Sequence, residues 1–160
     1  MNGKAHVYKR DHINTDEIIP ARYLTSDDET ELALHAMEDI DADFVKNVNA
    51  GDVIVASNDF GCGSSREHAI WSIRGAKVSC VIADSFARIF YRNAINNGFP
   101  VVELKGATES ISNGDEIEVH LKEGKVINHT TGKELSFTPL PDFAFKIADA
   151  GGLLESIKDI

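Results

Sequence analysis

Val53-Ile54-Val55-Ala56 decides the fold, together with the glycine-rich turn Gly61-Cys62-Gly63 that follows it. A short apolar run of this kind suits a buried strand, and residues 66–74 after the turn are expected to form a helix. Residues 78–83 form a second apolar run, which a further helical pattern separates from a third strand at residues 100–104. Strands and helices that alternate in this way indicate parallel pairing with right-handed crossovers.

The segments before this unit begin with a short strand expected at residues 5–9. A polar, turn-prone loop over residues 11–16 follows, whose side chains can bond to nearby backbone. Ser26-Asp27-Asp28-Glu29 has the form of a capping box. It is expected to start a helix whose apolar stripe consists of Leu32, Ala33, Ala36 and Met37.

The segments after Gly106 have an antiparallel pattern. Residues 115–121 alternate acidic and apolar side chains before Glu123-Gly124, a plausible hairpin turn, and residues 133–138 can continue the sheet. Residues 143–157 suggest a helix interrupted at Gly151-Gly152. The expected fold is therefore α/β, with a mixed sheet that combines β-α-β units with additional antiparallel strands, in a single domain over residues 1–160.

Composition narrows the class of protein. The chain of 160 residues has 42% hydrophobic and 26% charged residues, which suits one compact domain. The formal charge of −10 argues against nucleic acid as a partner, because phosphate-backbone binding needs a basic surface. No stretch is long and apolar enough for a membrane or a secretory signal, so we expect no membrane partner and a cytoplasmic location.

The two cysteines, Cys62 and Cys80, are too few for a disulfide framework and lack the spacing of a metal site. Unreactive thiols are the simplest interpretation. Neither thiol can hold an iron–sulfur cluster alone, because such clusters need three or four. The expectation from the sequence is that this chain binds no metal.

The turn after the first apolar run offers chemistry for an organic acid. It lies between a strand and a helix, where backbone amides are unpaired and favour an anion. Ser64 and Ser65 can cap the helix and present hydroxyls, and Arg66 has a planar fork suited to a carboxylate. Dinucleotide, phosphate-loop and hydrolase-elbow motifs are absent. The serines could also be caps only, with Arg66 and Glu67 a solvated pair.

Three ordered motifs make a family resemblance. Gly63-Ser64-Ser65-Arg66-Glu67-His68-Ala69, with Asn14-Thr15-Asp16 upstream and Ser85-Phe86-Ala87-Arg88-Ile89 downstream, resembles the swivelling domain of the aconitase superfamily. Its separate-subunit form is the small subunit of isopropylmalate isomerases. Residues 16–24 and 90–94 also match, so the resemblance covers nearly the whole chain.

The resemblance implies a role for each matching residue. Ser64 would be the catalytic base, Arg66 would bind a substrate carboxylate, and Asp16 would help to handle the leaving hydroxyl. The other residues expected to bind substrate are Ser65, Gly63, Thr15, Leu24 and Thr25. Glu67, His68 and Arg88 are expected to orient the site. The alternative is that Asn14, Thr15 and Asp16 only build a turn.

The resemblance also implies a partner and a reaction. A [4Fe–4S] cluster would lie on a larger subunit, and its open iron would bind the substrate hydroxyl as a Lewis acid. This chain would bind no cofactor and would be inactive alone. The implied activity is that of a hydro-lyase of leucine biosynthesis, isomerising 2-isopropylmalate and 3-isopropylmalate, which are small hydroxy-dicarboxylic acids, by dehydration and rehydration.

Other substrates and classes stay open. Tyr23-Leu24-Thr25-Ser26 has no arginine and is followed by acids, which favours an alkyl group over the extra carboxylate of homoaconitate. Arg22 could still enter the pocket, and Trp71 stands where a smaller residue is expected. Hydro-lyases of the dimethylmalate, citramalate or homoaconitate type are therefore alternatives. A non-catalytic organic-acid-binding module is a rival from another class, and a hydrolase using Ser64 lacks the spacing of a triad.

Overall fold

The structure, a computed structural model, describes residues 1–64 and 66–139. Its centre is a mixed seven-stranded sheet with the order β4-β3-β2-β1-β5-β6-β7. The strands are β1 (Asn2–Tyr8), β2 (Val53–Ala56), β3 (Cys80–Ala83), β4 (Val101–Glu103), β5 (Glu116–His120), β6 (Lys125–Asn128) and β7 (Lys133–Ser136). Strands β1 to β4 pair in parallel, whereas β5 pairs antiparallel to β1 and to β6, and β7 antiparallel to β6. The predicted mixed sheet is confirmed.

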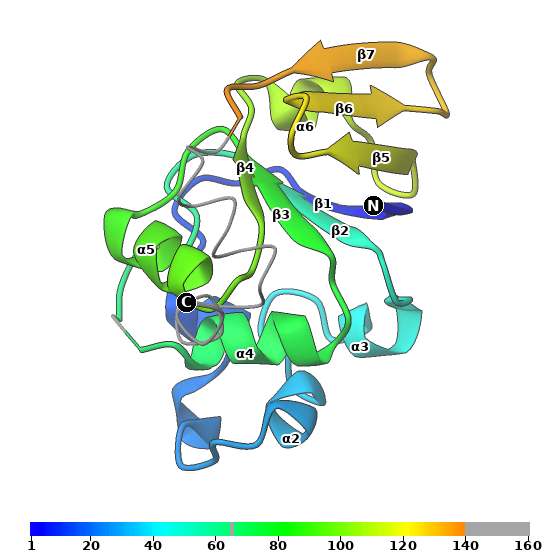
Figure 1. The fold of residues 1–160 in the computed structure, drawn as a ribbon. Coiled ribbons are helices and arrows are strands. Elements are labelled where there is room, and N and C mark those ends of the chain that lie inside the picture. The colour runs from blue at the N-terminus through cyan, green and yellow to red at the C-terminus, as the bar shows by residue number, and fades with distance from the viewer. Residues whose placement is uncertain (65, 140–160) are drawn as a thin grey trace, which may run out of the picture.

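Short helices connect and cover the parallel strands. They are α1 (Thr15–Ile18), the 3-10 helix η1 (Ala21–Tyr23), α2 (Glu29–Ala33), α3 (Phe44–Asn47), α4 (His68–Gly75), α5 (Arg88–Asn96) and α6 (Ala107–Ser110). Helix α4 joins β2 to β3, and α5 joins β3 to β4, so the chain contains the two expected β-α-β units. In Figure 1 the hairpin strands β5 to β7 lie at the end of the molecule away from α2 and α4.

Both faces of the parallel strands are buried, which explains their continuous apolar sequences. Ile54 and Val81 point into a core that includes Ile70 of α4 and Phe90 of α5. Their neighbours along the strands point to the other face, where Val55, Ile82 and Val102 pack with Ile117, Val119 and Val126 of the hairpin strands. Each such side chain contributes roughly 1.5–3 kcal/mol by leaving water.

The helix boundaries differ from two sequence-based expectations. Asp28, not Ser26, is the N-cap of α2, and its side chain accepts the amide of Thr30 at 2.9 Å. Ser26 instead accepts the amide of Asp28 at 3.2 Å, so the predicted capping box is wrong. Helix α2 also ends at Ala33, although all four residues of the predicted stripe are buried.

Helix α5, which ends at Asn96, closes at a glycine. Gly98 has a φ of 69°, and its amide donates to the carbonyl of Ile95 at 3.0 Å. The amide of Phe99 donates to the carbonyl of Ala94 at 2.8 Å, which completes a Schellman motif. The interrupted helix expected at residues 143–157 lies outside the described residues. Among residues 1–64 and 66–139, no helix has the length and apolar character to cross a membrane.

Candidate active site

Three loops meet at the carboxyl ends of β1, β2 and β3, the edge where open α/β sheets bind ligands. The middle loop, residues 57–67, is hydrogen-bonded on both sides. Its Gly61 amide donates to the carbonyl of Ile13 at 2.7 Å, and its Phe60 amide donates to that of Ser85 at 3.1 Å. The loops that carry the three recognised motifs therefore form one continuous layer of backbone.

Helix α1 places Thr15 and Asp16 beside the middle loop. Asn14 caps this helix, because its side chain accepts the amide of Glu17 while the Glu17 side chain accepts the amide of Asn14. Buried Ile18 and Ile19 hold α1 against the core. Asp16 is exposed in the first turn, whereas Thr15 is buried. The turn predicted for residues 14–16 therefore exists as a helix start that leaves Asp16 free for chemistry.

Thr15 holds the predicted catalytic serine in place. Its hydroxyl oxygen accepts the backbone amide of Ser64 at 3.0 Å, and its own amide donates to the carbonyl of Cys62 at 2.8 Å. Gly63 lies between them with a φ of 106°, and a Cβ there would be 3.2 Å from the Thr15 hydroxyl. Glycine is required here because the backbone is left-handed and Thr15 approaches closely.

Most of the predicted site residues surround one recess. Its lining consists of Thr15, Asp16, Ile19, Leu24, Ser64, Arg66, His68 and Ala69. The recess has a volume of only about 10 Å³, which suits a single water. Ligand pockets usually measure about 300–1,000 Å³. The chain therefore offers one wall of a site rather than an enclosed cavity.

Ser64 is a turn residue, not a helix cap. Its hydroxyl oxygen accepts the backbone amide of Arg66 at 3.2 Å. Helix α4 has Glu67 as its N-cap, and the Glu67 side chain makes no capping hydrogen bond. The expectation that Ser64 caps this helix is therefore wrong, and the alternative in which Ser64 is only a cap loses its support. Ser65 lies outside the described residues.

His68 and Glu67 connect the recess to neighbouring elements. The Nε2 atom of His68 lies 3.2 Å from Asp27, and its buried Nδ1 has no partner among residues 1–64 and 66–139. The carboxylate of Glu67 accepts from Asn97 at 3.3 Å, and the Asn97 side-chain oxygen accepts the indole N–H of Trp71 at 3.1 Å. Trp71 is partly buried and packs against the core.

Two predicted residues lie away from the recess. Arg88 starts α5 and lines a separate hollow of about 510 Å³ with Phe86, Tyr91, Arg92 and Glu103. Thr25 is exposed and does not line the recess, although its neighbour Leu24 does. The structure thus separates Arg88 and Thr25 from Ser64, so their predicted roles at this site gain no geometric support.

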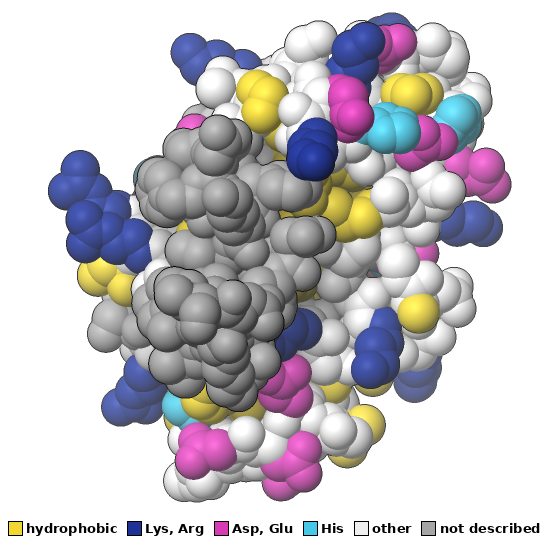
Figure 2. All heavy atoms as spheres, viewed as in Figure 1, with side chains coloured by type: hydrophobic (Ala, Val, Ile, Leu, Met, Phe, Trp, Pro, Cys, Tyr) yellow, Lys and Arg dark blue, Asp and Glu magenta, His cyan; other side chains and the backbone are white. Residues whose placement is uncertain are grey.

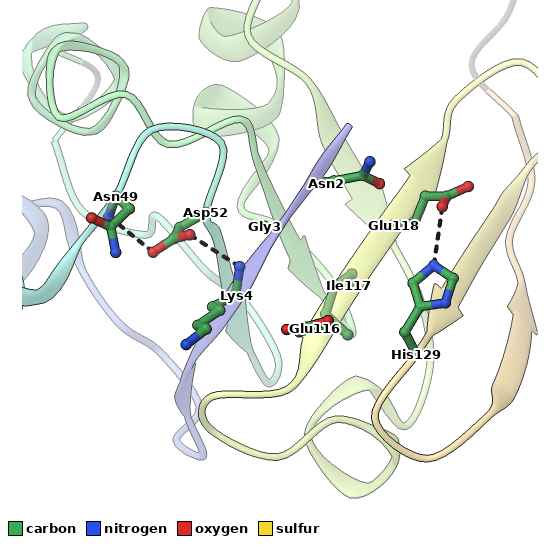
Figure 3. Close-up of a pocket in the computed structure, with 9 residues that line it drawn as sticks. All are labelled: Asn2, Gly3, Lys4, Asn49, Asp52, Glu116, Ile117, Glu118 and His129. Carbon is green, nitrogen blue, oxygen red and sulfur yellow. Dashed lines mark hydrogen bonds and ion pairs between the residues drawn. The ribbon is translucent and has the colours of Figure 1, made fainter.

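A larger hollow lies at the opposite end of the parallel strands. It measures about 430 Å³, and Figure 3 shows Lys4, Asn49 and Asp52 on one side of it and Glu118 and His129 on the other. It is bigger than the recess, yet no predicted site residue lines it. The face drawn in Figure 2 carries basic and acidic side chains interspersed, with histidines beside acidic groups over β5 and β6. We therefore place the chemistry at the recess.

One group of metal-type ligands was missed by sequence reasoning. His12 Nδ1, a carboxylate oxygen of Asp59 and the Sγ of Cys62 all lie within 4.8 Å of one another. Forty-six residues separate His12 from Asp59, so no local spacing motif could reveal the group. The usable signal was topological, because both loops follow neighbouring parallel strands and end at the same edge.

Comparison with known proteins first gives the class. Residues 6–107 match the model of the aconitase C-terminal domain. A small subunit 2 of 3-isopropylmalate dehydratase from Deinococcus radiodurans is 63% identical over 96% of this chain and 74% of its own length. The small subunit of that enzyme from Clostridium beijerinckii is 54% identical over 99% of both chains.

A solved structure agrees with these relatives. The crystal structure of 3-isopropylmalate dehydratase from Methanocaldococcus jannaschii matches with a TM-score of 0.93 and 42% identity, covering 99% of this chain and 93% of that one. The fold and the recess thus define an aconitase C-terminal-type domain. Within that class, the chain belongs to the family of 3-isopropylmalate dehydratase small subunits.

Proposed function

We propose that this chain is the small subunit of a heteromeric hydro-lyase that isomerises 2-isopropylmalate and 3-isopropylmalate in leucine biosynthesis. The observation that carries the proposal is the gathering of Asp16, Ser64 and Arg66 around one recess, in a chain of this family. Asp16 comes from helix α1, and Ser64 and Arg66 come from the loop after β2, at the carboxyl edge of the sheet. Dehydration needs a base, a carboxylate anchor and a group that handles the departing hydroxyl, and this set offers all three.

Ser64 is the proposed base that removes the proton next to the substrate carboxylate. A serine hydroxyl is a weak base in water, so its deprotonated form needs a nearby cation and a dry site. Arg66 is two residues away and can supply the positive charge while its guanidinium pairs with the carboxylate. Fixing Ser64 through Thr15 and the Arg66 amide lowers the cost of orientation.

Asp16 and the apolar wall complete this chain's contribution. The exposed carboxylate of Asp16 lines the same recess and is the proposed partner of the hydroxyl that leaves and returns. Ile19 and Leu24 also line the recess and suit the branched alkyl group of isopropylmalate. Asp27, Asp28 and Glu29 follow nearby in the sequence and would repel a third carboxylate.

The remaining part of the site is assigned to a large subunit. A [4Fe–4S] cluster does not fit this chain, because the cluster needs three or four cysteines and the chain has two, of which Cys80 is fully buried in β3. When bound to the large subunit, the cluster would act as a Lewis acid on the substrate hydroxyl. The small volume of the recess supports the same division, because a second chain is needed to enclose a dicarboxylate.

A substrate comparison tests the proposal. The chain is mixed with its large subunit under anaerobic conditions and assayed with isopropylmalate, dimethylmalate, citramalate and homoaconitate. We expect isopropylmalate to have the highest kcat/KM. Turnover of homoaconitate alone would overturn the substrate assignment. Binding of these acids without turnover by the assembled pair would instead identify an organic-acid-binding module.

A further inference from the structure

The loops behind the catalytic recess bring together a thiol, an imidazole and a carboxylate. His12 follows β1, whereas Asp59 and Cys62 belong to the loop after β2. The His12 Nδ1 lies 2.8 Å from an oxygen of Asp59, and all three ligand atoms lie within 4.8 Å. Nothing in the proposed hydro-lyase chemistry uses these side chains.

We propose that His12, Asp59 and Cys62 form a binding site for a divalent transition metal ion of the zinc type. Zinc binds these three ligand types at about 2.0–2.3 Å, which in tetrahedral geometry places ligand atoms about 3.3–3.8 Å apart. The observed separations need only small movements to reach those values. His12 and Asp59 have exposed side chains, 70% and 40% respectively, so little packing resists such movements.

The ligand types select the metal. A thiolate and an imidazole favour zinc, cobalt or iron over magnesium and calcium, which bind oxygen ligands. Only one of the three groups here supplies oxygen. Three protein ligands leave a fourth position for water, as in open zinc sites.

The local backbone orients two of the ligands in an unusual way. His12 and Asp59 have φ values of 56° and 57°, in the left-handed region that residues other than glycine rarely adopt. Hydrogen bonds hold both residues there: the amide of His12 donates to the carbonyl of Asn58 at 2.9 Å, and the amide of Asp59 donates to the Ser85 hydroxyl at 2.8 Å. The two side chains are thereby turned toward each other and toward Cys62.

A bound ion would join the two loops that carry the recess. The carbonyl of Cys62 accepts the amide of Thr15, and the Thr15 hydroxyl accepts the amide of Ser64. The ion would therefore bind at Cys62, whose backbone is hydrogen-bonded to Thr15, the residue that positions Ser64 and precedes Asp16. Its role would be to hold the loops together, independent of the hydro-lyase assignment.

Metal binding should release a proton. A cysteine binds a metal ion as the thiolate, whereas an ordinary cysteine thiol is protonated at neutral pH, so the ion must displace a proton from Cys62. We expect release of about one proton per ion bound, measured with a pH indicator in weak buffer.

Cobalt titration of the full chain tests the proposal directly. In a buffer with a non-thiol reductant, Co²⁺ alone should produce a thiolate-to-cobalt charge-transfer band with a one-to-one end point, and Zn²⁺ should remove it. Cys62→Ala should abolish the band, although Cys80 remains. His12→Asn and Asp59→Asn, which tolerate the left-handed backbone, should weaken binding at least about tenfold, because even indirect partners contribute that much.

The control is His129→Ala, which removes a histidine that also pairs with a carboxylate, that of Glu118, but does not belong to the group of His12, Asp59 and Cys62. It should leave the cobalt band unchanged. Zn²⁺ should also raise the Tm of the wild-type chain and not that of Cys62→Ala. Absence of the band in the wild type, or its persistence in Cys62→Ala, would overturn the metal site and leave the proposed hydro-lyase function untouched.

Discussion

Thr15 is the residue on which the geometry of the recess depends most. It is buried, and its hydroxyl accepts the amide of Ser64 while its own amide is bonded to Cys62. Thr15 therefore links α1, which carries Asp16, to the turn that carries Ser64. A change of one oxygen atom at this position should alter the site without altering the core.

Thr15→Val should lower both stability and activity. Valine keeps the shape but leaves the Ser64 amide without its acceptor, which costs about 1 kcal/mol. The resulting movement of Ser64 should lower kcat by about tenfold to a hundredfold. Urea unfolding and steady-state kinetics of the assembled enzyme measure the two effects.

Thr15→Ser is the matched control, because it keeps the hydroxyl and loses only a methyl group. Its kcat should stay close to that of the wild type. Equal loss of kcat in both variants would show that the hydroxyl does not position Ser64.

At the scale of single residues, the sequence identified Asp16, Ser64 and Arg66, and the structure places them together. The sequence alone did not indicate which of the flanking polar residues line the recess. Arg88 belongs to one of the three family motifs, yet it starts helix α5 and lines a different hollow. The group of His12, Asp59 and Cys62 could not be recognised in the sequence, because its members are distant in the chain and only the pairing of two parallel strands brings them together.

At the scale of elements, the turn before α4 depends on close contact with α5. Gly61 has a φ of 87°, and a Cβ there would lie 2.2 Å from the Phe90 ring. Gly114 has nearly the same φ, 88°, but open space around its Cα. Alanine substitutions at these two glycines therefore distinguish the free-energy cost of a left-handed backbone from that of a steric clash.

Gly61→Ala should destabilise the chain more than Gly114→Ala does. Each variant incurs about 1–2 kcal/mol for a left-handed alanine, and Gly61→Ala adds about 1–3 kcal/mol for the clash. Chemical denaturation gives the free energy of unfolding for each. If the two variants lose the same amount, the contact between this turn and α5 does not constrain the site loop.

Asp52 ties the start of β1 to the loop before β2, beside the hollow in Figure 3. Its carboxylate accepts from His6 Nε2 at 2.8 Å and from the amides of Asn49 and Lys4 at 2.9 Å and 3.0 Å. Burial alone would raise the pKa of Asp52, but these hydrogen bonds outweigh it and hold the pKa below its ordinary value.

The lowered pKa fixes the direction of a pH effect. Asp52 stabilises the fold above its unfolded-state pKa of about 3.9, and this contribution is lost as pH falls through the lower folded-state pKa. Asp52→Asn should therefore be less stable than the wild type at neutral pH, and the difference should shrink in acid. Urea unfolding at several pH values measures it, and a difference independent of pH would contradict the assignment.

Element prediction succeeded where burial dominates and failed where short-range capping competes. The parallel strands and the Schellman end of α5 follow from apolar runs and from Gly98. The start of α2 cannot be predicted in this way, because Ser26, Asp27 and Asp28 are all good N-cap residues. Only the tertiary position of the helix selects Asp28. The same competition explains why Ser64 forms a turn, while Glu67 occupies the N-cap position of α4 without a side-chain cap.

At the scale of the whole molecule, the chain presents the proposed site as an open recess and does not enclose it. The recess collects the proposed base, anchor and hydroxyl-handling group but has room for about one water. The parallel half of the sheet and its helices support these residues, and the hairpin strands cover the other face. The proposed function therefore predicts that the large subunit encloses the substrate at this edge of the sheet.

The most direct test compares Ser64→Ala with Ser57→Ala in the enzyme assembled with its large subunit. Ser57 lies at the start of the same loop, and its hydroxyl is 3.3 Å from that of Thr108, away from the recess. We predict that Ser64→Ala lowers kcat for isopropylmalate by about a hundredfold to ten-thousandfold, with subunit affinity and the activity of Ser57→Ala unchanged. Retention of kcat in Ser64→Ala, or loss of activity only in proportion to lost subunit binding, would contradict it.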